Sequence, residues 1–113
     1  MKQVIKNLED VIRETVASRL QEYMGERSVK AYSAFFNNAL TICLTDVFSP
    51  AEEHFAVNRD NMECIQSLKG RQFDAIKPQL SRDIQEVCGE KIREVNSFVT
   101  ENAERFVVIH FRK

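Results

Sequence analysis

The chain has 113 residues, of which 43% are hydrophobic and 29% charged, and its formal net charge is −1. This length and composition predict a single globular domain over residues 1–113, and they exclude intrinsic disorder. A net charge near zero provides no overall field that would draw the protein to nucleic acid or to an anionic membrane.

The first predicted element is an amphipathic helix over residues 3–24, because apolar residues recur there at helical spacing. These residues are Ile5, Leu8, Ile12, Val16, Leu20 and Tyr23. Gly25 follows, and glycine is the usual residue at a left-handed helix end. Lys2 and Lys6 interrupt the start with charge, unlike the apolar core of a signal peptide, and no apolar run approaches the roughly 18 residues of a membrane span. We therefore expect a cytoplasmic protein.

A β-hairpin is predicted next, over about residues 31–36 and 39–45. Leu40, Ile42 and Leu44 alternate with less apolar residues, which is the period of a strand. The dipeptide Asn37-Asn38 suits a two-residue turn, since asparagine tolerates a positive φ. The opposite face of this hairpin is also largely apolar, unlike the polar face that a solvated side of a sheet usually has.

A short helix is predicted from residue 50 to about residue 57. Ser49 is a suitable N-cap, Pro50 suits the first helical position, and Glu52 completes a capping box with Ser49. Asp60 and Glu63 offer a second capping box at the start of the next helix.

A longer helix is predicted over residues 60–88, ended by Gly89. Pro78 interrupts it, but the apolar rhythm continues from Ile76 to Leu80, which favours a kink over a break. Charges of both signs are interleaved in this region, which is typical of a solvated helix face. They are Lys69, Arg71, Lys77, Arg82, Lys91 and Arg93 with Asp74, Asp83, Glu86, Glu90 and Glu94.

Two final strands are predicted over residues 91–99 and 104–111. Both faces of the last strand are apolar for most of its length, which is typical of a central strand. The order helix-strand-strand-helix(-helix)-strand-strand predicts an α+β fold, a two-layer sandwich with a four-stranded, mostly antiparallel sheet.

The helices of one chain can cover one face of this sheet, which leaves Tyr32, Phe36, Phe106 and Val108 for the other. We interpret this second face as an interaction surface, most simply a homodimer interface of roughly 1,200–2,000 Å². The alternative is that the first helix wraps over this face within one chain.

No constellation typical of catalysis, cofactor binding or metal binding is visible. His54 follows Glu53, and adjacent residues on a helix point apart, so this helix offers no two-point metal site. Cys43, Cys64 and Cys88 lack metal-binding or redox spacing, which favours a reducing compartment. Cys43 in a predicted strand and Cys88 at a predicted helix end are interpreted as small packing residues. We therefore expect a non-catalytic protein with no cofactor and no metal.

Two other functions fit the element order less well. One type of KH domain, an RNA-binding fold, has a similar order, but its Gly-x-x-Gly loop is missing, since Ser67-Leu68-Lys69-Gly70 supplies one glycine. The chain also has no basic face, which makes nucleic acid an unfavoured partner. A small-ligand sensor with an unrecognised pocket is the other alternative.

Three segments carry a resemblance to a known family. They are Tyr23-Met24-Gly25, residues 47–52, and residues 71–89 with Pro78 inside and Gly89 at the end. Over nearly its full length the chain resembles the MpsC-like family of small proteins. This family is assigned to a Na⁺-translocating, membrane-potential-generating system and was long catalogued as a domain of unknown function. The chain departs from the family pattern at Ser49, where threonine is typical.

The resemblance implies a non-catalytic accessory protein, linked to a membrane system that moves ions or inorganic carbon. It implies a cytoplasmic location, peripheral to the membrane through a partner, and assigns no catalytic residues. We predict a partner or anion site where Tyr23, Met24 and Arg27 approach Ser49 and Glu52, since helix N-termini favour anions. The alternative for these segments is mutual capping and packing.

Overall fold

The computed structural model describes residues 2–112, with side chains described from residue 8 onward. The elements are α1 (Lys2–Met24), β1 (Ala31–Phe36), β2 (Ala39–Leu44), α2 (Pro50–Phe55), α3 (Arg59–Cys88), β3 (Ile92–Val99) and β4 (Arg105–Phe111). The strands pair in antiparallel fashion in a four-stranded sheet with the order β1-β2-β4-β3. The predicted α+β fold and the central position of the last strand are confirmed.

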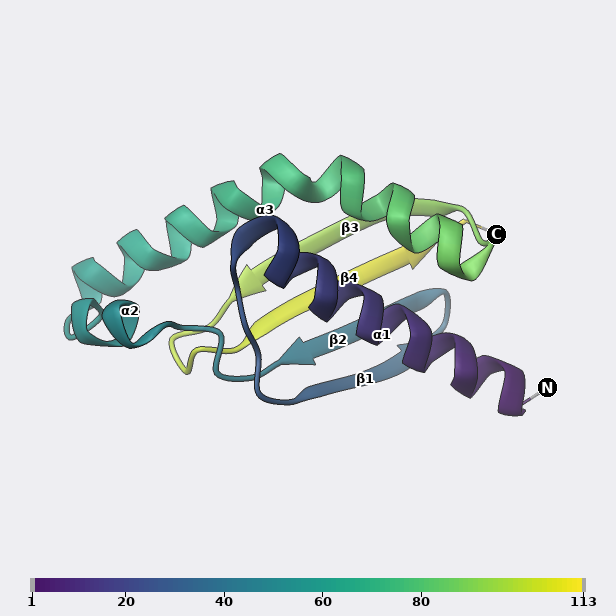
Figure 1. Cartoon of the computed structure of the whole chain (residues 1–113), viewed down its shortest axis with the longest axis horizontal. Coiled ribbons are helices and arrows are strands. Elements are labelled where there is room, and N and C mark those ends of the chain that lie inside the picture. Colours follow the sequence, from purple (N-terminus) through teal and green to yellow (C-terminus); the bar gives the residue numbers. More distant parts are fainter. Residues whose placement is uncertain (1, 113) are drawn as a thin grey trace.

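Both long helices lie over the same face of the sheet (Figure 1). Helix α1 contacts α3, β1 and β2, and α3 contacts β3. The alternative in which the first helix wraps over the second sheet face is therefore wrong. The apolar stripes of the two helices divide this face between them, α1 over β1 and β2 and α3 over β3.

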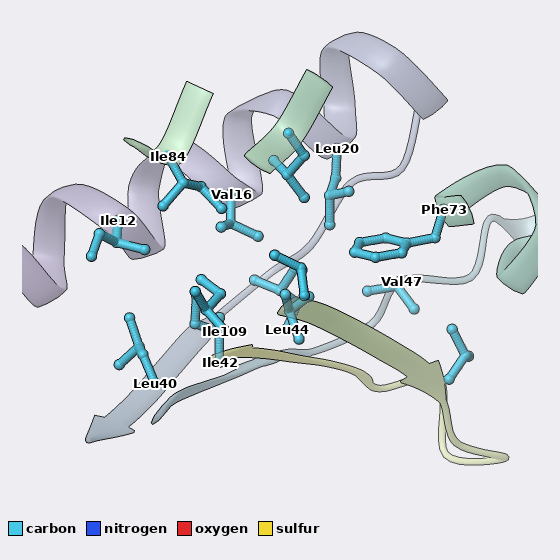
Figure 2. Packing of buried hydrophobic residues seen from close by; sticks show 14 of the residues in the cluster. Ile12, Val16, Leu20, Leu40, Ile42, Leu44, Val47, Phe73, Ile84 and Ile109 are labelled. Carbon is cyan, nitrogen blue, oxygen red and sulfur yellow. The ribbon is translucent and has the colours of Figure 1, made fainter. Parts of the chain in front are cut away.

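The core lies between α1, α3 and this covered face. Ile12 and Val16 point from α1 toward Leu40 and Ile42 on the sheet (Figure 2), and all of them are 0% exposed. Residues on the strands alternate between the two faces, so the residues next to Leu40 and Ile42 point away from the helices. The predicted contribution of Ile5 lies outside the described side chains.

The hairpin between β1 and β2 has the predicted register. Phe35 pairs with Leu40, and Phe36 pairs with Ala39 across the two-residue turn. Asn37 has φ of +56°, in the left-handed region that asparagine tolerates. The turn chemistry read from Asn37-Asn38 therefore sets which residues share a face.

Helix α3 is continuous for 30 residues with Pro78 inside it. Figure 1 shows it as one arched ribbon, so the proline does not divide the helix. Its N-cap is Asn58, whose side chain accepts a hydrogen bond from the Asn61 backbone N–H at 2.9 Å. The capping box predicted from Asp60 is wrong, because the helix begins one residue earlier, at Arg59.

Candidate functional site

A cleft of about 470 Å³ opens where the end of α1 meets the β2–α2 loop and the middle of α3. Met24 and Arg27 line one side of it. Ser49 and Glu52 line the other. Four of the residues predicted as a partner or anion site, from two segments distant in the sequence, are thus brought together around one cleft.

The first wall of the cleft is the turn that ends α1. Gly25 has φ of +67°, and its N–H donates to the Gln21 carbonyl at 2.9 Å. The Glu26 N–H donates to the Leu20 carbonyl at 3.2 Å. The glycine allows this reversal without the steric cost that a Cβ would bring in the left-handed region. The reversal turns Glu26 inward, where only 5% of its surface is exposed.

Behind the cleft lies a group of buried charges, Glu26, Lys69 and Arg105, which we call the ion cluster. Arg105 is 0% exposed and donates from Nε and Nη2 to the two oxygens of Glu26 at 2.7 and 3.1 Å. Lys69 Nζ donates to Glu26 at 3.1 Å and to the Val47 carbonyl at 3.2 Å. One carboxylate therefore pairs with two buried cations, and its loss would leave Arg105 without a counter-charge.

Other contacts complete the surroundings of Arg105. Its Nη1 donates to the Ser97 hydroxyl at 2.7 Å, and its Nη2 also donates to the Lys69 carbonyl at 3.3 Å. The guanidinium lies 5.3 Å from the centre of the Phe73 ring, within the range of a cation–π contact. Throughout the described side chains, every buried nitrogen or oxygen has a hydrogen-bond partner. The ion cluster is therefore fully satisfied in the folded protein.

The start of α2 is tied to the ion cluster through Glu52. The predicted capping box is present: the Ser49 N–H donates to Glu52 Oε1 at 2.8 Å, and the Glu52 N–H donates to Ser49 Oγ at 3.1 Å. The same Oε1 atom lies 3.4 Å from Lys69 Nζ, and the Glu52 side chain is 25% exposed. Glu52 thus both caps the short helix and joins the rim of the cleft to its buried floor.

Two residues of the predicted solvated face are in fact buried. Lys69 is 3% exposed and Asp83 is 7% exposed, so the interpretation of both as solvated is wrong. A signal for Lys69 was available, because it lies four residues after Ile65 and four before Phe73, on the buried stripe of α3. A lysine at a position of the apolar stripe indicates a buried charge, and this pattern is present in the sequence around Lys69.

The other two members of the ion cluster, Arg105 and Glu26, differ in whether the sequence pattern indicates that they are buried. Arg105 shares its strand face with Val107 and Ile109, which are both 0% exposed, so alternation alone places it in the core. Glu26 lies in a loop after a helix, where no periodicity applies. Only the fold brings its carboxylate to the two cations.

Tyr23 does not belong to the cleft. Its hydroxyl donates to Asp83 on α3, which also accepts from Arg19 Nε at 3.1 Å and from Gln79 at 3.0 Å. Burial acts to raise the pKa of Asp83, but the hydrogen bonds from Tyr23 and Gln79 and the charge of Arg19 outweigh it, so the pKa lies below its ordinary value. The hydrogen bond to Asp83 raises the pKa of the Tyr23 hydroxyl. Tyr23 therefore connects α1 to α3 as a packing residue.

The second predicted surface is the sheet face opposite the helices, which we call the open face. Its residues, row by row across β1, β2, β4 and β3, are Tyr32, Cys43, Phe106 and Phe98; Ala34, Thr41, Val108 and Asn96; and Phe36, Ala39, His110 and Glu94. Phe36 is 77% exposed and Tyr32 is 56% exposed. The predicted residues Tyr32, Phe36, Phe106 and Val108 all lie on this face.

Phe98 belongs to the open face but was not predicted there. Its ring stacks on that of Phe106, with centroids 5.2 Å apart, and 56% of its surface is exposed. On β3 it shares its face with Asn96 and Glu94, which are polar. Because these neighbours are polar, the sequence of β3 does not indicate an apolar surface at Phe98. Only the pairing of β3 with β4 places Phe98 beside an aromatic neighbour.

The groups considered for catalysis are dispersed. His54 is exposed on α2, and no cluster of three or more histidine, cysteine or acidic side chains suited to a metal occurs in the part of the chain described. Burial raises the pKa of the Cys43 thiol and of the Cys88 thiol, which lowers the fraction of nucleophilic thiolate at neutral pH. These surroundings favour packing roles for both thiols.

Comparison with known proteins identifies a family. The family model described as "Na+-translocating membrane potential-generating system (MpsC)" matches residues 5–113. Searches of curated proteins and of solved structures found no match. Within residues 2–112, no helix combines the length and the apolarity needed to cross a bilayer.

Proposed function

The chain belongs to the MpsC family, and from this membership we propose that it is a non-catalytic accessory protein of a Na⁺-translocating, membrane-potential-generating system. In this proposal the protein acts in the cytoplasm and reaches the membrane by binding a protein component of that system. The binding surface is the cleft between the end of α1 and the start of α2.

The observation that carries the proposal is the convergence of the family-like segments. Residues 23–25 and 47–52 are separated by a hairpin in the sequence, yet Met24, Gly25, Ser49 and Glu52 line the same cleft. The floor of the cleft is Lys69, which the ion cluster holds in place. A concave surface with a fixed floor suits recognition, because a preorganised site loses little conformational entropy when its partner binds.

The charges around the cleft support a protein partner with polar groups of its own. Arg27, Asp46 and Glu52 line the cleft, and they carry charges of both signs. Charge patterns of mixed sign contribute specificity and register to an interface. Arg27 is exposed and is absent from the ion cluster, so it is the residue best placed to contact a partner without supporting the fold.

The test is capture of the membrane system by the tagged, full-length protein. We would purify the tagged protein from its native cells in mild detergent and identify co-purifying proteins by mass spectrometry. We expect enrichment of a multi-spanning protein of a Na⁺-translocating system, and loss of that protein with Arg27→Glu. The matched control is Arg59→Glu, whose side chain is 91% exposed and lies away from the cleft on α3.

The experiment has clear contrary outcomes. Equal capture by wild type and Arg27→Glu would remove the cleft from the proposal. RNA that co-purifies at moderate salt in place of a membrane protein would favour the nucleic-acid alternative. A Glu52→Ala variant that lowers thermal stability but leaves capture intact would assign the family-like segments to capping and packing.

A further inference from the structure

The open face remains unexplained after the cleft is assigned, since α1 and α3 both pack on the other side of the sheet (Figure 1). We propose that the open face binds the open face of a second copy of this chain, which forms a two-fold symmetric dimer with two sheets packed face to face. This inference concerns a different surface from the cleft and does not rest on the accessory role.

The first argument is the concentration of exposed aromatic side chains on this face. Phe36 is 77% exposed, and Tyr32 and Phe98 are each 56% exposed. All three belong to the rows of the open face. Contiguous apolar surface of this kind is uncommon on a monomer and marks an interaction site.

The second argument is how charge is distributed within the face. On its two central strands the face carries Ala39, Thr41 and Cys43 from β2 and Phe106, Val108 and His110 from β4, with no acidic residue, lysine or arginine among them. The acidic residue Glu94 lies on β3, an edge strand, in the row at one end of the face. Protein interfaces have this anatomy, with charge depleted at the centre and tolerated at the rim.

The third argument is area. Strands about 4.8 Å apart and a rise of about 3.3 Å per residue give the face a footprint of roughly 20 Å by 20 Å. The accessible surface of protruding side chains is larger than its projection. Two such faces have a combined footprint of about 800 Å² before side-chain relief is counted, which approaches the lower end of the roughly 1,200–2,000 Å² that a stable interface buries.

These arguments favour a second copy over other occupants. A two-fold axis brings the same patch to both sides, so an apolar face meets an apolar face of the same size. Sheets that pack face to face at about −30° are a common architecture with a core about 10 Å thick. The middle of the open face has no charge that would select an acidic or basic partner, in contrast to the cleft.

Pairing between the exposed edges of β1 from two chains is a different way to form a dimer. The two kinds of dimer bury different parts of the chain. Edge pairing would use the backbone of β1 and would leave the middle of the open face in solvent. Face packing buries Val108, which lies on β4 between β2 and β3. A charge at Val108 therefore separates the two modes.

The experiment is measurement of the mass of the full chain by sedimentation velocity over a range up to about 100 µM, which covers the micromolar affinities of small interfaces. We expect the wild type to have twice the monomer mass of 13.1 kDa. We expect Val108→Glu to weaken dimerisation at least tenfold, about the effect of losing a central interface residue. The matched control is Val57→Glu, since Val57 is 76% exposed on the α2–α3 connection and lies off the open face.

Two further measurements keep the inference testable if the Val108→Glu protein does not fold. The first is Phe36→Glu, which changes a highly exposed residue that contributes little to the core and should also weaken the dimer. The second is the melting temperature of the wild type, which rises with protein concentration if folding and dimerisation are coupled. A monomeric wild type, or a Val108→Glu protein that folds and stays dimeric, would overturn the inference.

The outcomes for this inference and for the accessory role can be separated. A monomeric protein that captures a membrane protein, and loses it with Val108→Glu, would give the open face to that partner and overturn the dimer. A dimer broken by Val108→Glu, together with no captured membrane protein, would leave the inference intact and remove the accessory role.

Discussion

The two faces of the sheet use the same strands and have opposite surroundings. On β2, Leu40 and Ile42 are 0% exposed under the helices, whereas their neighbours Ala39 and Thr41 lie half-buried on the open face. On β1, the largest exposed side chain is Phe36 at 77%. The apolar residues of the open face therefore do not serve the core of one chain, which is why we assign that face to a partner.

The faces also differ in how they treat charge. The covered face contains Arg105, a fully buried cation whose charge is balanced by Glu26. The open face keeps Glu94 at an edge strand, where water can reach it. A buried charge needs a counter-charge close to it, while a charge at the rim is stabilised by water.

The largest effect is expected when the ion cluster loses its carboxylate. Glu26→Gln should lower the free energy of unfolding by about 3–5 kcal/mol, because Arg105 would remain buried with no counter-charge and Lys69 would keep only Glu52, at 3.4 Å. Urea unfolding followed by circular dichroism measures this. The control is Glu22→Gln, whose carboxylate is 62% exposed and pairs with Arg19 at 3.3 Å; it should cost less than about 0.5 kcal/mol. Equal losses of unfolding free energy in both variants would contradict a stabilising role of the ion cluster.

The next effect compares the two faces directly. Leu40→Ala should lower the free energy of unfolding by about 2–5 kcal/mol at every protein concentration, since it opens a cavity in the core. Phe36→Ala should cost under about 0.5 kcal/mol in dilute protein, as expected for an exposed residue. Its cost should increase with concentration as the dimer becomes the reference state. A concentration-independent cost for Phe36→Ala would contradict the distinction between the faces.

A smaller effect should come from Asp83, which joins α3 to α1 above the covered face. Its pKa is lowered from an ordinary value of about 3.9, so its contribution to stability is complete above that pH and is lost as pH falls through the lowered pKa. Asp83→Asn should therefore cost about 1–3 kcal/mol near neutral pH, the range for hydrogen bonds to a charged group. Unfolding measured between about pH 2 and pH 7 should show the difference from wild type shrinking in acid.

The exposed Asp74 on the same helix provides the control, and Asp74→Asn should change the free energy of unfolding by less than about 0.5 kcal/mol near neutral pH. A deficit of Asp83→Asn that stays constant down to the lowest pH would assign the effect to packing.

The smallest effect concerns the backbone of α3, the helix that extends along the covered face. Gly70→Ala should raise the free energy of unfolding by up to about 1 kcal/mol, because alanine favours the helix and a Cβ there meets no atom within 4 Å. The same change at Gly25 should destabilise by about 1–2 kcal/mol, since φ is +67° there. Thermal unfolding distinguishes the two signs, and the same sign at both positions would contradict this account of the α1 cap.

Much of the fold was predictable because it depends on short-range patterns. The capping box of Ser49 and Glu52, the Asn37-Asn38 turn and the glycine end of α1 each involve residues within a few positions of one another. The start of α3 was misjudged at Asp60, because several polar residues there are plausible caps and only the backbone conformation selects Asn58.

The candidate site was predictable only in part. The pairing of Met24 and Arg27 with Ser49 and Glu52 followed from the segments that resemble the family, but Tyr23 turned toward Asp83 instead. The ion cluster is not predicted, because interleaved charges of both signs are typical of a solvated helix face. A lysine inside an apolar stripe is a contrary signal that the sequence does contain.

The sequence by itself determined the elements, their order and the presence of two apolar sheet faces, because helical and strand periods and turn chemistry are local properties of the chain. Only the tertiary structure decided that α1 and α3 share one face, leaving the other open, and that Glu26, Lys69 and Arg105 meet under the cleft. The physical reason is distance along the chain. Glu26 and Arg105 are 79 positions apart, and no local pattern states which buried charge will balance another.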